Sequence, residues 1–432
     1  MSTTAALSLS SIPGADDITR VVLQNGIVVL ARENSNALSV TLRGYLPAGS
    51  LLDPDDKLGL ADFVADALMR GTAKREFQAI YDAMESVGAS FGFGSGTHTA
   101  SFGGKSLTED LPLLLDLLNE GLRAPQFPAD QVEKLRAQLL TGLALRAQDT
   151  HDMASLVFEE LVYRQHPYGR PESGHPETIG AITVDDLVAF HRLAYGPRGM
   201  VVAVVGGIPP ENAVELVRAS LEDWTNAEQT PVPELPDWEE LPERIYKRHA
   251  IPGKSQSDLV IGTAGPPRLA PDFMAANLGN SILGRFGLMG RVGDAVREKA
   301  GMAYYAYSSL SGGTGPGAWD VAAGVNPANE TKAIDLIFKE LERFTGELVN
   351  EEELSDSQSN YVGSMPLSLE SNSGVADAML NIERYQLGLD YYRLYPQLIQ
   401  SVTREQVREA AAKYLQVGKL AVAVAGPPRI EV

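Results

Sequence analysis

GLADFVADALMRGT, the sequence from Gly59 to Thr72, shows apolar residues at helical spacing. This periodicity predicts a short amphipathic helix over Leu58–Met69. Asp62 and Asp66 stand four residues apart and therefore share one face of that helix. Two carboxylates at this spacing could hold a hard cation, but such ions need further oxygen ligands, which neither aspartate brings. Solvated or hydrogen-bonded acids are the favoured interpretation.

Further along the chain, one pattern of a helix followed by a strand occurs twice. Thr183 opens a helical pattern, and the apolar strand after it ends at Gly206. Thr403 opens a second helical pattern, whose following strand ends at Gly426. Both pairs of positions have the same offset, because 403 − 183 and 426 − 206 are each 220. A shared offset of this kind indicates an internal repeat.

A second match and a linker divide the chain. Asp116 and Asp335 lie in similar apolar helical patterns, 219 residues apart (335 − 116). The sequence between the halves, 226–243, contains four prolines and many acidic residues. Proline stiffens the chain and removes hydrogen-bond donors, so this segment is predicted to be an extended linker. We therefore predict an N-terminal lobe at 15–225 and a C-terminal lobe at 244–432.

Strand and helix patterns are mixed within each half. Val21–Leu23 and Ile27–Leu30 flank Asn25-Gly26, which is a strong hairpin signal. A strand is predicted near Val40–Tyr45 and a glycine-rich strand over Ala89–Phe102. Helical patterns at 76–87 and over most of 109–163 follow, and 312–317 is predicted to be a turn between strands. This mixture predicts an α+β fold with helices layered on sheets.

Composition excludes several functions. The 432 residues carry a formal net charge of −20, which disfavours nucleic acid and membrane surfaces as partners. The acidic surface serves either solubility alone or the attraction of basic peptides. The absence of cysteine excludes disulfides, thiolate catalysis and cysteine-bound zinc. Met1–Pro13 lacks the features of a signal peptide, and no apolar run reaches the roughly 18 residues of a membrane span, so a cytoplasmic location is predicted.

The sequence at 59–72 resembles the zinc-binding helix of the pitrilysin/insulinase peptidases, which include the mitochondrial processing peptidases. That helix reads roughly GLAHxxEHxLxxGT, and the matching positions are Gly59, Leu60, Ala61, Leu68, Gly71 and Thr72. In the family, two histidines bind zinc, the glutamate between them is the general base, and a later glutamate is the third ligand. Here Asp62 and Asp66 occupy the histidine positions, Ala65 the base position and Gly142 the third-ligand position. The six histidines supply no replacement pair on one helical face.

VREKAGMAY, from Val296 to Tyr304, resembles a second signature of the same family. The resemblance implies that Arg297 and Tyr304 bind substrate, with arginine holding the peptide backbone and tyrosine donating to the developing oxyanion. On spacing alone, the alternative is that Arg297 caps a helix and Tyr304 begins a strand. Neither residue can activate water without a metal or a base.

A third matching feature is the glycine-rich stretch Ser90–Thr97. In the family, the corresponding edge strand pairs with the backbone of the substrate. Glycine there would let another backbone approach closely, but it would equally make a weak strand.

The resemblance implies two homologous lobes, each a mostly antiparallel sheet covered by helices, joined by an extended linker. It further implies a non-catalytic, substrate-binding subunit of a heterodimeric zinc endopeptidase, inactive alone. The partners would be a zinc-bearing homologous subunit and an extended peptide, and no cofactor is expected in this chain. A metal-free scaffold or assembly protein of the same fold is the alternative, and a homodimeric peptide-binding protein is a third reading.

Overall fold

The computed structural model describes residues 12–287 and 290–429. These residues form two compact units, each assembled from segments that are distant in sequence. Unit 1 comprises the described parts of Met1–Thr141, Pro171–Glu234 and Ser364–Tyr395. Unit 2 comprises the described parts of Gly142–Arg170, Leu235–Gly363 and Pro396–Val432. Each unit therefore contains one segment from the opposite half of the sequence.

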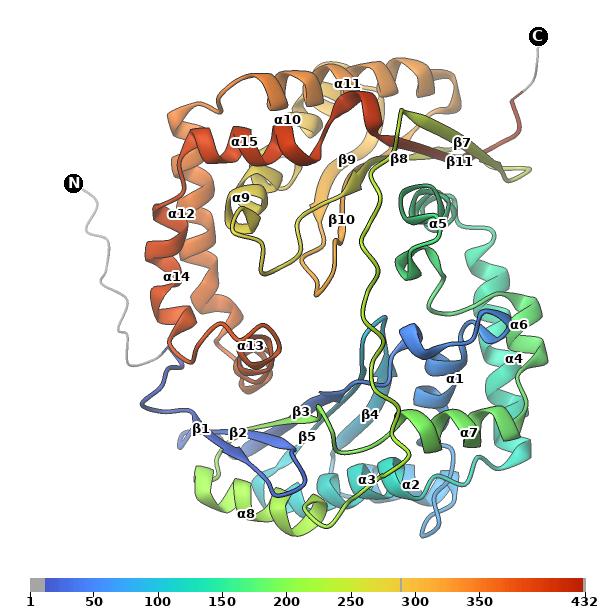
Figure 1. The fold of residues 1–432 in the computed structure, drawn as a ribbon, viewed down its shortest axis with the longest axis vertical. Helices are drawn as coiled ribbons and strands as arrows, with labels where there is room; N and C mark the ends of the chain where they lie inside the picture. Colours follow the sequence, from blue (N-terminus) through green and yellow to red (C-terminus); the bar gives the residue numbers. More distant parts are fainter. Residues whose placement is uncertain (1–11, 288–289, 430–432) are drawn as a thin grey trace. The chain divides into compact units, whose positions relative to one another are not determined.

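The sheet of unit 1 has six strands in the order β1-β2-β6-β3-β5-β4 (Figure 1). In chain order the strands are β1 (Thr19–Val22), β2 (Val28–Glu33), β3 (Ser39–Leu46), β4 (Ser90–Ser95), β5 (Ala100–Leu107) and β6 (Val201–Gly206). β2 and β6 are parallel, and the other neighbouring pairs are antiparallel. The sheet is therefore mixed but mostly antiparallel, and β4 is an edge strand.

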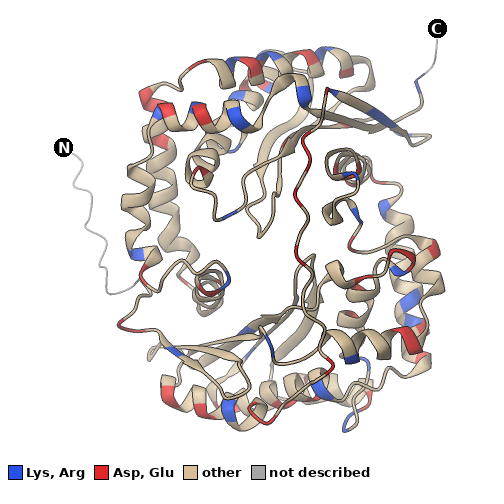
Figure 2. Ribbon diagram, viewed as in Figure 1, with Lys and Arg blue, Asp and Glu red and all other residues tan. Residues whose placement is uncertain are grey.

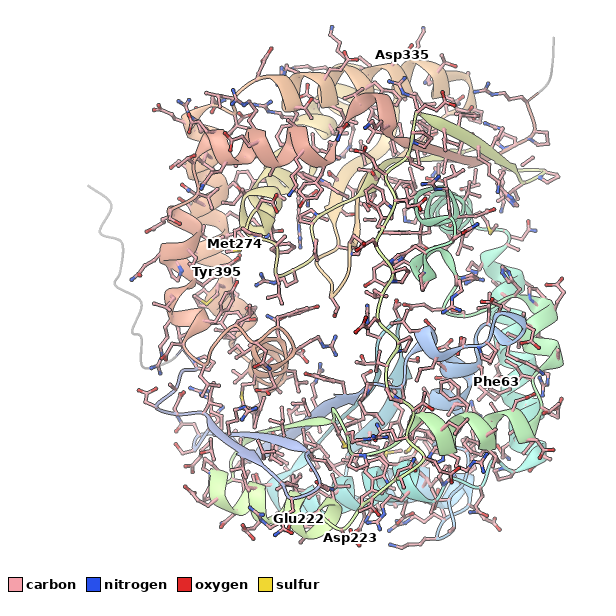
Figure 3. All side chains as sticks on the ribbon, in the orientation of Figure 1. Phe63, Glu222, Asp223, Met274, Asp335 and Tyr395 are labelled. Atoms are coloured by element: carbon pink, nitrogen blue, oxygen red, sulfur yellow. The ribbon has the colours of Figure 1, made fainter. Side chains whose placement is uncertain are left out.

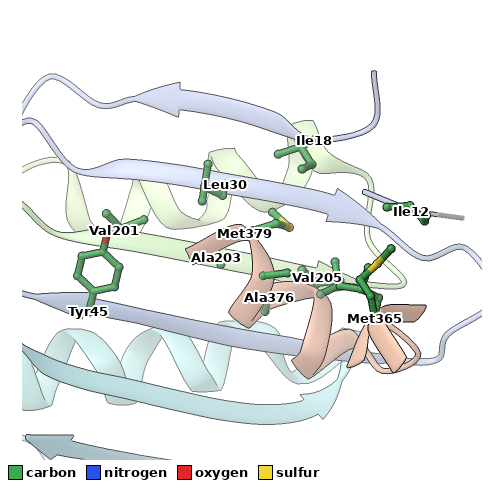
Figure 4. Close-up of a cluster of buried hydrophobic side chains, with 13 residues drawn as sticks. Ile12, Ile18, Leu30, Tyr45, Val201, Ala203, Val205, Met365, Ala376 and Met379 are labelled. Atoms are coloured by element: carbon green, nitrogen blue, oxygen red, sulfur yellow. The ribbon is translucent and has the colours of Figure 1, made fainter. Parts of the chain in front are cut away.

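Seven helices belong to unit 1: α1 (Leu60–Ala67), α2 (Phe77–Glu85), α3 (Leu111–Arg123), α6 (Pro176–Ala181), α7 (Val184–Ala194), α8 (Pro210–Leu221) and α13 (Asn372–Arg384). α13 packs on β3 and β6, although it comes from the C-terminal half of the sequence. Its Ala376 and Met379 join Val201, Ala203 and Val205 of β6 in a buried apolar cluster (Figure 4). Burial of such surface stabilises the unit by roughly 25 cal/mol per Å².

The sheet of unit 2 has five strands in the order β7-β11-β8-β10-β9. They are β7 (Ile245–Ala250), β8 (Ser257–Ala264), β9 (Ala303–Leu310), β10 (Ala318–Val325) and β11 (Ala421–Gly426). β7 and β11 are parallel, and the other neighbouring pairs are antiparallel. β9 is an edge strand of this sheet, as β4 is in unit 1.

Helices of unit 2 are α5 (Thr150–Tyr163), α9 (Phe273–Gly284), α10 (Gly290–Val292), α11 (Glu330–Gly346) and α15 (Arg404–Tyr414). α5 packs on β8 and β11, although it comes from the N-terminal half of the sequence. Three more helices cross a boundary between units: α4 (Ala129–Arg146), α12 (Glu351–Ser368) and α14 (Tyr391–Gln400). Within 12–287 and 290–429, no helix has both the length and the apolar composition needed to cross a membrane.

The internal repeat is visible in the element bounds. Adding 220 to the bounds of α7 and β6 gives the bounds of α15 and β11. Both helices begin with a capping box, Thr183 with Asp186 and Thr403 with Gln406, which satisfies free backbone donors at the helix start. β6 and β11 are buried along their whole length, as expected for short apolar runs in the middle of a sheet. The predicted two-lobed α+β fold is confirmed.

One predicted element was wrong. The glycine-rich stretch 89–102 is not a single strand but the hairpin of β4 and β5. The chain reverses at Gly96, whose N–H donates to the carbonyl of Thr99. The segment 226–243 contains neither helix nor strand.

Acidic and basic side chains are spread over the helices of both units, so net charge alone does not mark a site (Figure 2).

Candidate functional site

The position of α1 is fixed by a buried aspartate and a glycine. Asp53 is 4% exposed and its carboxylate accepts hydrogen bonds from the backbone N–H groups of Gly59 and Ala61, at 2.9 and 2.8 Å. Gly59 has φ +91°, and a Cβ there would lie 2.7 Å from Cδ1 of Ile179. Only glycine fits this turn without strain. These contacts explain why the helix starts at Leu60, two residues after the predicted start at Leu58.

Asp62 and Asp66 are half-buried, while the other residues of α1 are buried. Phe63, next to Asp62 in the sequence, marks this helix in Figure 3. Burial, together with the charges of Asp66 and Glu172, raises the pKa of Asp62 to about 6. Burial also raises the pKa of Asp66, against the opposing charge of Arg70. Desolvation disfavours the charged form of a carboxyl group, which is the physical cause in both cases.

Neither carboxylate of α1 has a partner. Asp62 and Asp66 form no hydrogen bond or ion pair with any other residue within 12–287 and 290–429. Arg70, whose charge acts on Asp66, instead donates to Oε1 of Gln138 at 2.8 Å and lies over the ring of Phe77. Unpaired acids in a partly desolvated position are costly, so they call for an explanation.

Two further groups complete this acidic region. Tyr195, directly after α7, is 2% exposed, and its hydroxyl has no hydrogen-bond partner among the described residues. The charges of Asp62 and Asp66 raise the pKa of Tyr195 beyond the effect of its burial. Glu172 is exposed and accepts a hydrogen bond from the hydroxyl of Thr97, which follows β4. Sequence reasoning missed Glu172 and the role of Tyr195, because neither lies near α1 along the chain.

The other degenerate positions carry no functional group. Ala65 is buried in α1, and Gly142 is exposed on α4 with open space around it. A methyl group cannot accept a proton, and glycine has no side chain to coordinate a metal. Within the described residues, no group of three or more His, Cys, Asp or Glu side chains is placed to hold a metal ion. The residues present do not fit the family's zinc site.

Arg297 and Tyr304 belong to unit 2. Arg297 lies near the end of a π-helical segment, Gly293–Lys299, with its side chain 38% exposed and its Nε 3.7 Å from Oε1 of Glu298. Tyr304 is the second residue of β9 and is 66% exposed. These exposed fractions make both side chains accessible. π-Helical segments are rare and occur often at functional sites. The proposed role of the two residues stays a prediction.

The edge strand β4 borders a cavity. β4 pairs with β5 on one side, and no strand of the described sheet pairs with its other side. A cavity of about 550 Å³ lies on the face covered by α13, and Gly92, Gly94 and Gly103 line it. A Cβ at Gly92 would meet no atom within 4 Å. Arg43, Asp377 and Arg384 also line the cavity, and the guanidinium of Arg43 is paired with the carboxylate of Asp377.

The matching face of unit 2 is filled instead. Tyr305 and Tyr307 of β9 stack with a ring separation of 5.7 Å and hydrogen-bond with His151 of α5. Tyr305 also donates to the carboxylate of Asp258, which is 1% exposed. Asp258 accepts further hydrogen bonds from Thr150 and Gln256. This polar network was not predicted, since its members come from elements that no local pattern brings together.

Comparison with known proteins agrees with this description. Residues 28–173 match the family model described as insulinase (peptidase family M16), and residues 181–361 match that of the peptidase M16 inactive domain. An uncharacterised zinc protease of Mycobacterium leprae is 27% identical over 95% of this chain and 92% of its own length. The mitochondrial-processing peptidase subunit beta of Neurospora crassa is 28% identical over 45% of this chain and 41% of its own length. The crystal structure of a peptidase M16 inactive domain from Pseudomonas fluorescens has a TM-score of 0.89 at 27% identity, covering 96% of this chain and 99% of that chain.

The fold and the degenerate site define a two-lobed peptidase-type protein without the metal ligands of a peptidase. The chain belongs to the insulinase family of peptidases, M16. Within that family, the matches and the replaced positions support an inactive member.

Proposed function

We propose that this chain is the non-catalytic, peptide-binding subunit of a heterodimeric zinc endopeptidase. Its family hydrolyses peptides with zinc, while its own α1 offers Asp62, Ala65 and Asp66 in place of the ligands and the base. The zinc would come from a homologous subunit. The similarity to a protein named as a subunit of the mitochondrial processing peptidase supports an assembly of homologues.

The observation that carries this proposal is the edge strand β4 beside the glycine-lined cavity. An extended peptide can add to a free strand edge by backbone hydrogen bonds, and side-chain pockets then supply selectivity. Gly92 and Gly94 leave room that the counterpart strand β9 fills with Tyr305 and Tyr307. Unit 1 therefore has an open cavity where unit 2 has packed tyrosine rings, which supports a peptide site in unit 1.

In unit 2, Arg297 and Tyr304 are assigned to the substrate by resemblance and by their exposure. The guanidinium of Arg297 would hold a peptide carbonyl. The phenol of Tyr304 would donate to the oxygen that becomes negative when the partner's activated water attacks. A donor aimed at this oxygen typically contributes about 100-fold to the rate.

The test measures peptide cleavage by this chain mixed with a zinc-bearing homologue from the same source. Tyr304→Phe is expected to lower kcat by about 100-fold with little change in peptide affinity. Gly92→Phe is expected to raise KM by roughly tenfold, because the new ring fills the cavity beside β4. Gly180→Phe is the matched control, since Gly180 is exposed on α6 in the same unit and a Cβ there also meets nothing within 4 Å.

Two outcomes would overturn the proposal. Unchanged kcat in Tyr304→Phe would remove the catalytic contribution, and equal KM values for both glycine variants would remove the peptide site. Stable association with unrelated proteins, without affinity for peptides, would instead support the scaffold function. Tight peptide binding by a homodimer of this chain alone would support the third reading.

A further inference from the structure

The half-buried Asp62 and Asp66 differ from the fully buried acids of unit 1. Asp53 accepts two backbone hydrogen bonds, and Glu120 accepts hydrogen bonds from Thr72 and Arg75. The two aspartates on α1 have no such partner among the described residues, although both are partly desolvated. Two carboxylates that are partly desolvated and lack a partner are suited to bind a cation from a ligand.

Tyr195 gives independent support. A buried phenol hydroxyl normally has a hydrogen-bond partner, yet that of Tyr195 has none among the described residues. The hydroxyl also lies within electrostatic range of both carboxylates. A cation with several N–H donors, placed against Asp62 and Asp66, would give the phenol oxygen a donor as well.

We propose that Asp62, Asp66 and the Tyr195 hydroxyl bind the ammonium or guanidinium group of a basic side chain in the bound peptide. The proposal rests on the proposed peptide-binding function and names a class of residue that the peptide carries. Ammonium and guanidinium groups donate three or more hydrogen bonds and are satisfied by a few oxygens. Hydrogen bonds between charged groups of this kind are among the strongest in proteins.

A metal ion fits this arrangement less well. Ca²⁺ takes six to eight oxygen ligands, and Mg²⁺ requires a near-octahedral set. Within 12–287 and 290–429, no third carboxylate or histidine is placed to complete such a set. Glu172 acts on Asp62 only through its charge, and its carboxylate already accepts a hydrogen bond from Thr97. An organic cation is therefore the better match.

The place of the cluster connects it with the peptide site. α1 contacts β4 within unit 1. Thr97, two residues beyond the end of β4, donates to Glu172, whose charge reaches Asp62. A peptide strand that pairs with β4 would therefore lie next to an element that α1 contacts. The overall charge of −20 also favours basic peptides at long range.

The experiment uses the full chain and a series of nine-residue peptides made from serine, threonine and valine. One lysine is moved through the nine positions, and norleucine at the same position is the uncharged control. Binding is measured by fluorescence anisotropy at pH 7.5. We expect one position at which lysine binds roughly tenfold tighter than norleucine.

Isosteric variants assign the preference to the cluster. The double variant Asp62→Asn/Asp66→Asn is expected to abolish the lysine preference and to leave norleucine binding unchanged. Asp116→Asn, which removes one exposed and unpaired acid of the same unit, should keep the preference. Norleucine binding with no lysine preference at any position would overturn the inference but leave the proposed function intact.

A second measurement covers the case in which no peptide binds. n-Butylammonium at millimolar concentration should raise the Tm of the wild-type chain and not that of the double asparagine variant. That result would support the cation site while the proposed peptide function fails. Stabilisation by Ca²⁺ or Mg²⁺ but not by butylammonium would overturn the inference, as would no stabilisation by any of the three.

Discussion

Both units bury aspartates, and the comparison between the two sets separates a structural group from a binding group. In unit 2, Asp258 accepts hydrogen bonds from Thr150, Gln256 and Tyr305, and Asp320 accepts one from Ser309 at 2.7 Å. In unit 1, Asp62 has none within the described part of the chain. Burial raises the pKa of Asp320 and of Asp62 to about 6 alike. A raised pKa therefore does not distinguish the two sets, whereas the presence of partners does.

The difference predicts opposite responses to mutation. A carboxylate with partners stabilises the fold, and its removal leaves buried donors unsatisfied. A carboxylate without partners destabilises the fold, and its removal relieves that cost. Residues that lower stability and yet occupy a defined position are typical of binding sites. Stability measurements on matched variants of the two units can therefore test the functional assignment without knowledge of the ligand.

The largest effect is expected for Asp258→Ala. The substitution leaves the donors of Thr150, Gln256 and Tyr305 without their acceptor in a buried site. We expect a loss of about 3 kcal/mol in the free energy of unfolding. For a unit of this size, the Tm of the affected transition falls by roughly 6 to 12 °C, which calorimetry can measure.

The control for this variant is Asp335→Ala. Asp335 is exposed on α11 of the same unit, and no other described residue is its hydrogen-bond or ion-pair partner (Figure 3). Its replacement should change the free energy of unfolding by no more than about 0.5 kcal/mol. Equal Tm values for the two variants would show that the network around Asp258 does not stabilise unit 2.

A smaller effect of opposite sign is expected for Asp62→Asn. The pKa of Asp62 is about 6 in the folded chain, against 3.8 for a free side chain. The folded state therefore holds this proton more tightly, so the contribution of Asp62 to stability is fully present below pH 3.8 and is lost as the pH rises through about 6. Asparagine does not titrate, so the variant should be more stable than wild type by about 1 to 2 kcal/mol at pH 7.5.

The pH profile checks this sign. Thermal unfolding of Asp62→Asn and wild type at pH 4, 5, 6 and 7.5 should show no difference at pH 4 and a growing advantage of the variant above it. Asp116→Asn should show no such trend, because Asp116 is exposed. Lower stability of Asp62→Asn at pH 7.5 would mean that the carboxylate has a stabilising partner, which contradicts the comparison.

The part of this molecule that the sequence could predict is the part that depends on local patterns. The repeat of α7 and β6 in α15 and β11 follows from capping residues and apolar runs that lie within each segment. The shared face of Asp62 and Asp66 follows from helical geometry alone. Local patterns do not specify which sheet a helix covers, so the placement of α5 and α13 could not be predicted.

The contacts of the site depend on that tertiary placement. Tyr195 and Asp62 are 133 residues apart (195 − 62), and no periodicity relates them. His151 and Asp258 meet in one network because α5 packs on β8. The prediction that Asp62, Ala65 and Asp66 replace the ligands and the base rests on the sequence alone, because the chemistry of a ligand is a property of the residue itself.

The smallest effect is expected for Tyr195→Phe, with Tyr305→Phe in unit 2 as its counterpart. Tyr305→Phe deletes a hydrogen bond to the carboxylate of Asp258 and should cost about 1.5 kcal/mol. Tyr195→Phe deletes a hydroxyl that has no partner in the described structure, so stability should stay within about 0.5 kcal/mol of wild type or rise slightly. Both changes keep the ring, so packing is matched, and urea unfolding at pH 7.5 can compare them. If Tyr195→Phe lost as much stability as Tyr305→Phe, its hydroxyl would already have a partner inside the fold and would not be available to a bound cation.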